Sequence, residues 1–326
     1  MEHPVVGIDI GKSKFHVCLL LSDNKSRAKV FANSAEGHLQ LLEWLQQFQI
    51  SCVHACLEAT GNYGVGLAKQ LVQAGHLVSI VNPSRIQGFA QSEMSRTKTD
   101  KVDAAVIARF CAALRPTPWQ PLPEEVEQLQ AMVRRLEALG RMLQQEKNRL
   151  EVVTTEPVKA SMESLIEHLQ EDIANLRQLI REHFDQHAHL RSKRNLLVSI
   201  PGIGEQTAAV ILAEIGDIES FKSAKQLAAY GGLTPRERTS GTSVRGKPRL
   251  SRVGNRRLRK ALYMPAVCAS IFNPLLNQMR ERLLSRGKCK MAVLGAVMRK
   301  LLHLAYGVLK SGIPFDAEYK RTTAPT

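Results

Sequence analysis

The 326-residue chain is poor in the residues that mark several protein classes. Aromatic residues make up only 5% of it, which argues against base-stacking platforms as the main mode of nucleic-acid binding. Its six cysteines have neither zinc-ligand spacing nor the pattern of a disulfide framework, so we expect a reducing compartment. No signal peptide is evident, and charged residues interrupt the most apolar late stretch, residues 291–309. These absences predict a cytoplasmic protein without a membrane span.

Positive charge is abundant and concentrated in one part of the chain. The net charge is +15, and residues 191–326 hold 25 Lys+Arg against 8 Asp+Glu. The segment 236–260 alone carries ten basic residues and one acid. A polyanion is the natural partner of such a field, because each neutralised phosphate releases condensed counterions. The alternative is a solvated basic face that serves solubility.

The length suggests two or three domains. Residues 1–115 alternate strand and helix signals, a three-strand meander followed by βαβ units, which predicts an α/β domain with a mixed sheet. A proline-rich linker covers residues 116–123. Beyond it, apolar residues recur in steps of three and four over 129–150 and 162–180, which predicts an antiparallel coiled-coil hairpin or two helices packed on the first domain. From residue 194 the pattern is helical with short turns.

Four acids are placed so that they could share a site. Asp9 and Glu58 each stand at the carboxyl end of a predicted strand, and Asp100 and Asp103 lie one turn apart on a predicted helix. Four carboxylates this close would repel each other unless they bound Mg²⁺, which prefers oxygen ligands. Two such ions can stabilise both the attacking and the leaving oxygen of a phosphodiester. The set therefore favours phosphoryl transfer.

Each acid also has a simpler interpretation. Asp9 could be the phosphate-site acid of an actin-like sugar kinase, but no glycine-rich nucleotide loop follows it. Glu58 could be an ordinary strand-end acid. Asp100 could only cap a helix, and Asp103 could be solvated.

Two further segments suggest contact with phosphates. The turn around Gly202 and Gly204, with the sequence IPGIG, is similar to a helix-hairpin-helix module, whose amides bind the duplex backbone; a plain helix–helix turn is the alternative. The predicted loop 234–254 places hydroxyls among many cations. Composition alone does not choose a nucleophile among them, or exclude a loop that only binds phosphate. The hydroxyl residues are Thr239, Ser240, Thr242, Ser243 and Ser251.

These motifs resemble, over nearly the whole chain, the DEDD transposases of insertion-sequence family one-ten, which include the bridge-RNA-guided recombinases. The matching blocks are GIDIGKSKF, CLEATGNYG, VNP, FAQSEMSRTKTDKVDA, SIPGIG, AAYGGLTPRERTSGTSVRG, GNRRLRKALYMPA and GAVMRKLLHLAYGVLKSG. One departure is visible, because Ser251-Arg252 replaces the Ser-Lys that is frequent in the family.

The resemblance implies three regions: a RuvC-like (RNase H fold) catalytic domain over 1–121, a coiled-coil assembly segment over 122–190, and a mainly helical transposase domain over 191–326. It assigns the metal-binding acids to Asp9, Glu58, Asp100 and Asp103, and the nucleophile to Ser240. The nucleic-acid contacts we expect in the last region are Gly202, Gly204, Arg236, Arg238, Arg245, Lys247, Arg249, Arg252, Arg256 and Arg257.

The activity that the resemblance implies is Mg²⁺-dependent strand cleavage and exchange through a covalent phosphoserine. The implied partners are donor and target DNA, a structured guide RNA that pairs with both, and further copies of the chain in a dimer of dimers. The alternatives are a junction-resolving two-metal nuclease in which water attacks, and a non-enzymatic helix-hairpin-helix DNA-binding protein.

Overall fold

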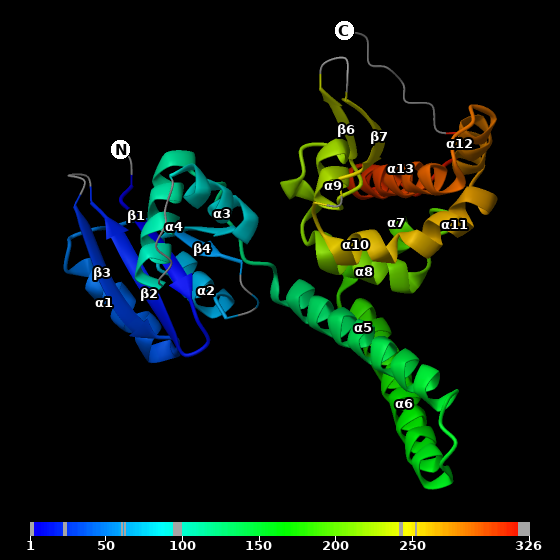
Figure 1. The fold of residues 1–326 in the computed structure, drawn as a ribbon, viewed down its shortest axis with the longest axis horizontal. Coiled ribbons are helices and arrows are strands. Elements are labelled where there is room, and N and C mark those ends of the chain that lie inside the picture. The colour runs from blue at the N-terminus through cyan, green and yellow to red at the C-terminus, as the bar shows by residue number, and fades with distance from the viewer. Residues whose placement is uncertain are drawn as a thin grey trace. The chain divides into compact units, whose positions relative to one another are not determined.

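The computed structural model describes residues 3–21, 25–59, 61, 63–93, 100–240, 244–251 and 253–318; for residues 100–101, 237–240 and 244–248 it describes the backbone only. Two compact units divide the chain, residues 1–121 and 122–326 (Figure 1). Each unit has its own hydrophobic core.

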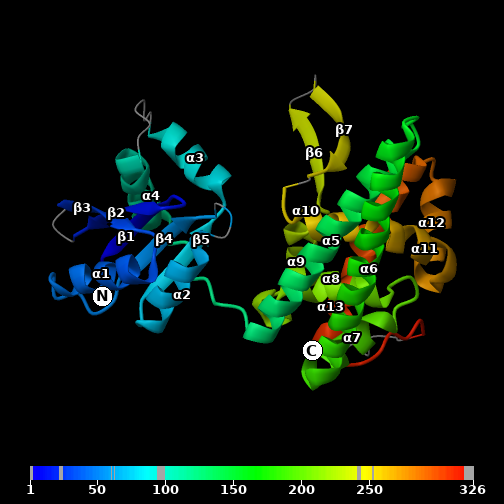
Figure 2. The same cartoon turned by 90° about the horizontal axis from the view of Figure 1, so that it is seen from below.

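The first unit is a mixed sheet covered by helices on both faces (Figure 2). The strands follow the order β3-β2-β1-β4-β5; β2 is antiparallel to β1 and β3, whereas β4 is parallel to β1 and β5. The mixed sheet predicted from the sequence is therefore confirmed. Its elements are β1 (Val5–Ile10), β2 (Lys14–Leu20), β3 (Ser26–Ala32), α1 (Ala35–Gln46), β4 (His54–Glu58), α2 (Val65–Gln73), β5 (Leu77–Val81), α3 (Pro83–Ser92) and α4 (Asp100–Leu114).

Alternation along β1 assigns its side chains to two cores. Val6 and Ile8 face α1 and α2, where they pack in one buried cluster. Val5 faces the opposite side, in a cluster that includes residues of α4. Since successive strand residues point to opposite faces, Gly7 and Asp9 share the α4 face with Val5.

The second unit is mainly helical, as the sequence predicts, and surrounds one large core. Its elements are α5 (Glu124–Leu150), α6 (Glu156–Gln186), α7 (Ala188–Val198), α8 (Glu205–Ile215), the 3-10 turn η1 (Ile218–Ser220), α9 (Ala224–Tyr230), β6 (Pro235–Ser240), β7 (Val244–Leu250), α10 (Arg256–Ala261), α11 (Tyr263–Phe272), α12 (Pro274–Ser285) and α13 (Lys290–Ser311). The helices α5 and α6 follow each other across a short turn and share buried residues such as Leu129 and Leu169.

Helix α13 is long and apolar enough to cross a membrane by length and composition. Its apolar side is nevertheless part of the core of the helical unit, with Val297, Leu301, Leu302 and Ala305 fully buried. A buried core helix has the same composition, and the structure gives the segment that role.

Two expectations of local structure differ from the observed fold. The segment predicted as the loop 234–254 contains an antiparallel hairpin, β6–β7, in which Arg236 pairs with Arg249 and Ser240 with Val244. The sequence pattern also does not predict helix α3, although Asn82 caps it through a bond from the Ser84 amide (2.9 Å) and Pro83 is its first residue. Asn-Pro after a strand indicates a turn, and here it also begins a helix.

Candidate functional site

Asp9 and Glu58 lie side by side at one edge of the first unit. The parallel register of β1 and β4 pairs Gly7 with Cys56 and Ile8 with Leu57, so the next residue on each strand is Asp9 and Glu58. Neighbouring strands are about 4.8 Å apart, and both acids point to the face that Gly7 and Cys56 occupy. Both are half-buried. The strand-end placement predicted from the sequence thus brings two carboxylates together.

Helix α4 covers this same face in a direction opposite to β1. The Sγ atom of Cys111, near the end of α4, donates to the carbonyl oxygen of His54 at the start of β4 (3.7 Å). A Cβ atom on Gly7 would lie 2.2 Å from the carbonyl oxygen of Ala104 and 2.2 Å from the amide nitrogen of Ala108. The first turn of α4 therefore lies toward the strand ends that bear the acids.

That first turn contains the other two predicted acids. Asp103 precedes Ala104 and is half-buried. Asp100 is the first residue of α4, and its side chain lies outside the described part of the structure. Among the side chains that are described, no group of three or more Asp, Glu, His or Cys residues is close enough to hold a metal ion. The set is thus a pair on adjacent strands, facing the helix that carries the other two acids.

The pair fits a divalent cation by its donor chemistry. Carboxylate oxygens are the ligands that Mg²⁺ prefers, and half-buried acids leave room for water and substrate oxygens. The resemblance of the sequence to DEDD transposases also implies a divalent metal. Asp9 and Glu58, with Asp103 and Asp100 on α4, are the residues that would hold it.

Asn33 is a further residue at this edge that the sequence analysis missed. Its Nδ2 atom donates to the carbonyl oxygens of Gly11 (2.9 Å), after β1, and of Tyr63 (3.2 Å), between β4 and α2. His38 contacts Asn33 Oδ1 (3.0 Å) and Gln70 Oε1 (3.2 Å), and burial lowers the pKa of its imidazole. This network ties together the two loops that follow the acidic strands.

Ser240 is the last residue of β6, at the distal end of the hairpin. Its side chain and those of Arg238, Arg245 and Lys247 lie outside the described part, as does the whole of Arg252. Arg236 and Arg249 are exposed and directly opposite each other. Because like charges across a strand pair repel, an anion bound between them would stabilise the hairpin.

The two predicted phosphate-binding glycines differ in their surroundings. Gly202 has a φ angle of +104°, and a Cβ atom there would lie 2.6 Å from Cβ of Ala269 on α11. Gly204, which caps α8, has nothing within 4 Å of a Cβ position. Close packing of helices explains Gly202 without any ligand, whereas the amides next to Gly204 are at an exposed helix start.

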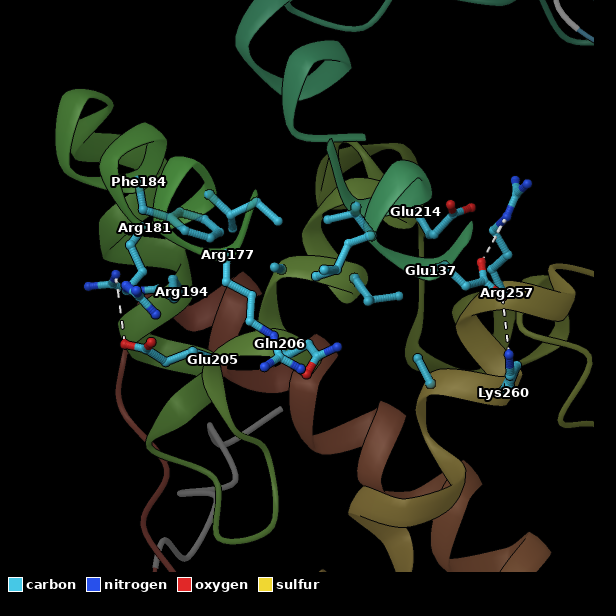
Figure 3. A pocket seen from close by; sticks show the side chains of 16 residues that line it. Glu137, Arg177, Arg181, Phe184, Arg194, Glu205, Gln206, Glu214, Arg257 and Lys260 are labelled. Carbon is cyan, nitrogen blue, oxygen red and sulfur yellow. Dashed lines mark hydrogen bonds and ion pairs between the residues drawn. The ribbon is translucent and has the colours of Figure 1, made fainter. Parts of the chain in front are cut away.

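Arg257 lines a cleft of about 410 Å³ between α5, α6, α8 and α10, shown in Figure 3. Glu137 binds Arg257 (3.4 Å) and Lys260 (3.3 Å) at one end of it. An adjoining cleft of about 520 Å³ includes Arg256. The first cleft also collects cations that the sequence analysis did not single out: Arg177, Arg181 and Arg194. They are scattered over helices of mixed charge, so only the fold brings them together.

Comparison with known proteins relates both units to one family. Residues 6–156 match the model of the DEDD transposases of IS110, and residues 194–281 match that of the IS116/IS110/IS902 family transposases. A pilin gene-inverting protein of Moraxella bovis is 37% identical over 319 residues, which cover 97% of this chain and 98% of that protein.

A more distant relative is itself named a transposase. The transposase for insertion sequence element IS1328 of Yersinia enterocolitica is 26% identical over 350 residues, covering 96% of this chain and 98% of the relative. Among solved structures, Thermus thermophilus RuvC aligns with a TM-score of 0.28 and 17% identity, over 36% of this chain and 99% of that one. On the family matches and the full-length similarity, this chain belongs to the IS110/IS116/IS902 family of transposases and is a DNA phosphoryl-transfer enzyme.

Proposed function

We propose that this transposase cleaves and exchanges DNA strands through a covalent phosphoserine at Ser240, with Asp9, Glu58, Asp100 and Asp103 as the metal-binding acids. The observation that carries the proposal is the in-register placement of Asp9 and Glu58 beneath the first turn of α4. The position of Ser240 at the distal end of a cationic hairpin supports the second half of the site.

The reaction balances without any further reactant. The hydroxyl oxygen of Ser240 forms a bond to phosphorus while the bond from phosphorus to a sugar oxygen breaks. The hydroxyl proton passes to a base at the site, and the departing sugar oxygen takes up a proton. In the joining step a sugar hydroxyl of another strand attacks the phosphoserine, and the serine hydroxyl is restored. Divalent ions held by the four acids, when bound, stabilise charge on the phosphate oxygens.

The helical unit supplies the positive charge that binds DNA, which the negatively charged acids of the sheet unit cannot do. Exposed arginines such as Arg236 and Arg249 neutralise DNA phosphates and position the duplex without reading its sequence. Arg256, Arg257 and the amides near Gly204 extend this contact. The α5–α6 pair serves as the assembly arm of a dimer of dimers, in which acids and serine of different protomers meet.

Sequence specificity comes from a structured guide RNA whose loops pair with donor and target DNA. In such an arrangement the protein recognises the heteroduplex mainly through its backbone, and base pairing selects the site. The full-length similarity to pilin gene-inverting proteins favours a second outcome of the same chemistry, inversion of a DNA segment, in which the exchanged ends lie on one molecule.

Trapping of the covalent intermediate tests this proposal. The protein is incubated with Mg²⁺, with labelled donor and target DNA, and with the RNA that is transcribed from the DNA flanking its gene. The mixture is then denatured. We expect a protein–DNA adduct that requires Mg²⁺ and the RNA, that Ser240→Ala abolishes, and that Ser251→Ala, a serine at the base of the same hairpin, preserves. An adduct formed by Ser240→Ala would disprove the nucleophile. Cleaved ends without attached protein would favour the water-dependent nuclease, and adduct formation without RNA would disprove guidance.

A further inference from the structure

Glu214 is a buried carboxylate that does not belong to the four proposed metal-binding acids. It lies near the end of α8, and its side chain is only 3% exposed. Arg134 Nε of α5 is 3.4 Å from one carboxylate oxygen, and Asn255 Nδ2 donates to the other (2.7 Å). A buried charge of this kind costs desolvation energy that an apolar residue of similar size would avoid. Its presence needs an explanation other than stability.

The partners of Glu214 flank the hairpin that carries Ser240. The chain leaves α9 at Tyr230 and returns at Asn255, whose amide donates to the carbonyl oxygen of Tyr230 (2.6 Å). Tyr230 Oη donates to the carbonyl oxygen of Glu214 (2.9 Å) and accepts from Asn255 Nδ2 (3.2 Å). Burial raises the pKa of the Tyr230 hydroxyl, which keeps it protonated as a donor. Glu214 thus holds both ends of the hairpin segment through one side chain and one carbonyl.

Backbone packing shows how closely these ends approach. Gly254 has a φ angle of +135°, and a Cβ atom there would lie 2.3 Å from the carbonyl oxygen of Tyr230 and 2.7 Å from the amide of Gly232. Further along the hairpin, Arg299 of α13 donates to the carbonyl oxygen of Leu233 (3.2 Å) and to Thr234 Oγ1 (3.3 Å). The base of the hairpin is therefore fixed to three helices, whereas β6 and β7 pair only with each other in the described sheet.

We infer that Glu214 is a positioning residue for strand cleavage: through Asn255 and Tyr230 it sets the angle at which the hairpin presents Ser240. This inference rests on the proposed nucleophile. Ser240 is six residues from Thr234, about 20 Å along an extended strand, so a tilt of about 3° at the base moves the serine by about 1 Å. Misplacement by that distance costs about a hundredfold in rate at a site that depends on orientation. In Figure 3, Glu214 is visible in the wall of the cleft.

Three substitutions loosen this contact, and the first two keep the side chain nearly the same size. Glu214→Gln removes the charge. Tyr230→Phe removes only the hydroxyl. Asn255→Ser keeps an acceptor for the Leu258 amide, which Asn255 Oδ1 now caps (3.0 Å), but removes the donor to Glu214. Glu219→Gln is the matched control, because Glu219 is an exposed carboxylate of the same unit, paired with Lys310.

The first measurement is hydrogen–deuterium exchange of the free protein. We expect amide exchange in residues 233–251 to rise about tenfold in each variant, with the core of α13 unchanged and the control like wild type. The second is cleavage of labelled DNA, in which kcat should fall about a hundredfold while KM for DNA stays within a factor of about two.

The outcomes separate the two proposals. Faster exchange with wild-type kcat would overturn the positioning role, and so would wild-type exchange in all three variants. If Ser240→Ala still forms the adduct, the proposed nucleophile fails, and with it the purpose assigned to Glu214. In that case the exchange data still report whether Glu214 holds the hairpin. A loss of kcat in Tyr230→Phe with an unchanged melting temperature would support positioning over general stability.

Discussion

Each of the two units of this transposase holds a pair of like charges on adjacent strands, and the two pairs have opposite signs. In the sheet unit, Asp9 and Glu58 are two like charges held on adjacent strands by the backbone register. In the helical unit, Arg236 and Arg249 are two like charges of the other sign on adjacent strands. Small cations can neutralise the first pair, and a long polyanion the second. The difference indicates that Asp9 and Glu58 act through their exact spacing, whereas Arg236 and Arg249 act through the density of positive charge.

The sharpest test of this contrast is to remove one acidic charge from the sheet unit. Asp9→Asn should lower the rate of strand cleavage about a thousandfold, because a proposed metal ligand is lost, while DNA affinity changes less than about twofold. Glu36→Gln, at an exposed carboxylate of α1, is the control and should cleave normally. Cleavage assays measure the rate of strand cleavage, and filter binding measures the affinity for DNA. Normal cleavage by Asp9→Asn would remove the acids from the mechanism.

The effect of moving α4 away from β1 on the stability of the sheet unit can be measured at Gly7. Gly7→Ala forces α4 away from β1 and should lower the free energy of unfolding by about 3 kcal/mol. Gly88→Ala in α3 meets nothing within 4 Å and should raise it by about 0.5 kcal/mol. Both tryptophans, Trp44 and Trp119, belong to this unit, so their fluorescence in denaturant follows it alone. Equal stability of the two variants would contradict the close packing of α4.

The electrostatic side of the comparison predicts a salt effect. Replacing both Arg236 and Arg249 by Gln should reduce the slope of log affinity against log salt concentration by about two, one for each lost phosphate contact. Lys29→Gln, on β3 of the sheet unit, should leave the slope unchanged. Titrations of labelled duplex at several salt concentrations decide this. A similar change of slope at Lys29 would mean that the positive field is not confined to the helical unit.

The smallest expected effect is a pH dependence of the stability of the sheet unit. Burial lowers the pKa of His38 and His76, both in the sheet unit, below the ordinary value of 6.5. Below pH 6.5 the unfolded chain therefore binds more protons than the folded one. The contribution of these two histidines to the free energy of unfolding is fully present above pH 6.5, and it is lost as the pH falls through their lowered pKa values in the folded protein. Fluorescence-detected unfolding at pH 7.5 and 5.5 should show the loss. The double variant with Gln at both positions should lose less over that interval.

The sequence predicted the features that depend on local pattern. Asp9 and Glu58 could be placed because each follows an apolar run that is typical of a strand, and the mixed sheet followed from the order of those runs. The mixed-sheet fold could therefore be predicted from this pattern, whereas the family came from the resemblance of eight sequence blocks to those of its members.

Features that depend on distant contacts could not be predicted in this way. Asn33 contacts Gly11 and Tyr63, which are 22 and 30 residues away, and nothing near Asn33 in the sequence marks that role. Gly202 has the sequence context of a phosphate-binding glycine, and only the approach of Ala269 shows its packing function. The hairpin β6–β7 was missed because its strands contain Pro235, Glu237, Gly246, Lys247 and Pro248, residue types that are depleted in strands.

The joining of Tyr230 to Asn255 has a consequence for how such enzymes diversify. Since the chain departs from and returns to almost the same point, the intervening 24 residues form a segment whose outer part can vary in length while Leu233 and Gly254 at its base keep their packing in the helical unit. Grafting the corresponding segment from a relative, with the junctions placed at Tyr230 and Asn255, should thus transfer its contacts with the DNA backbone as a unit.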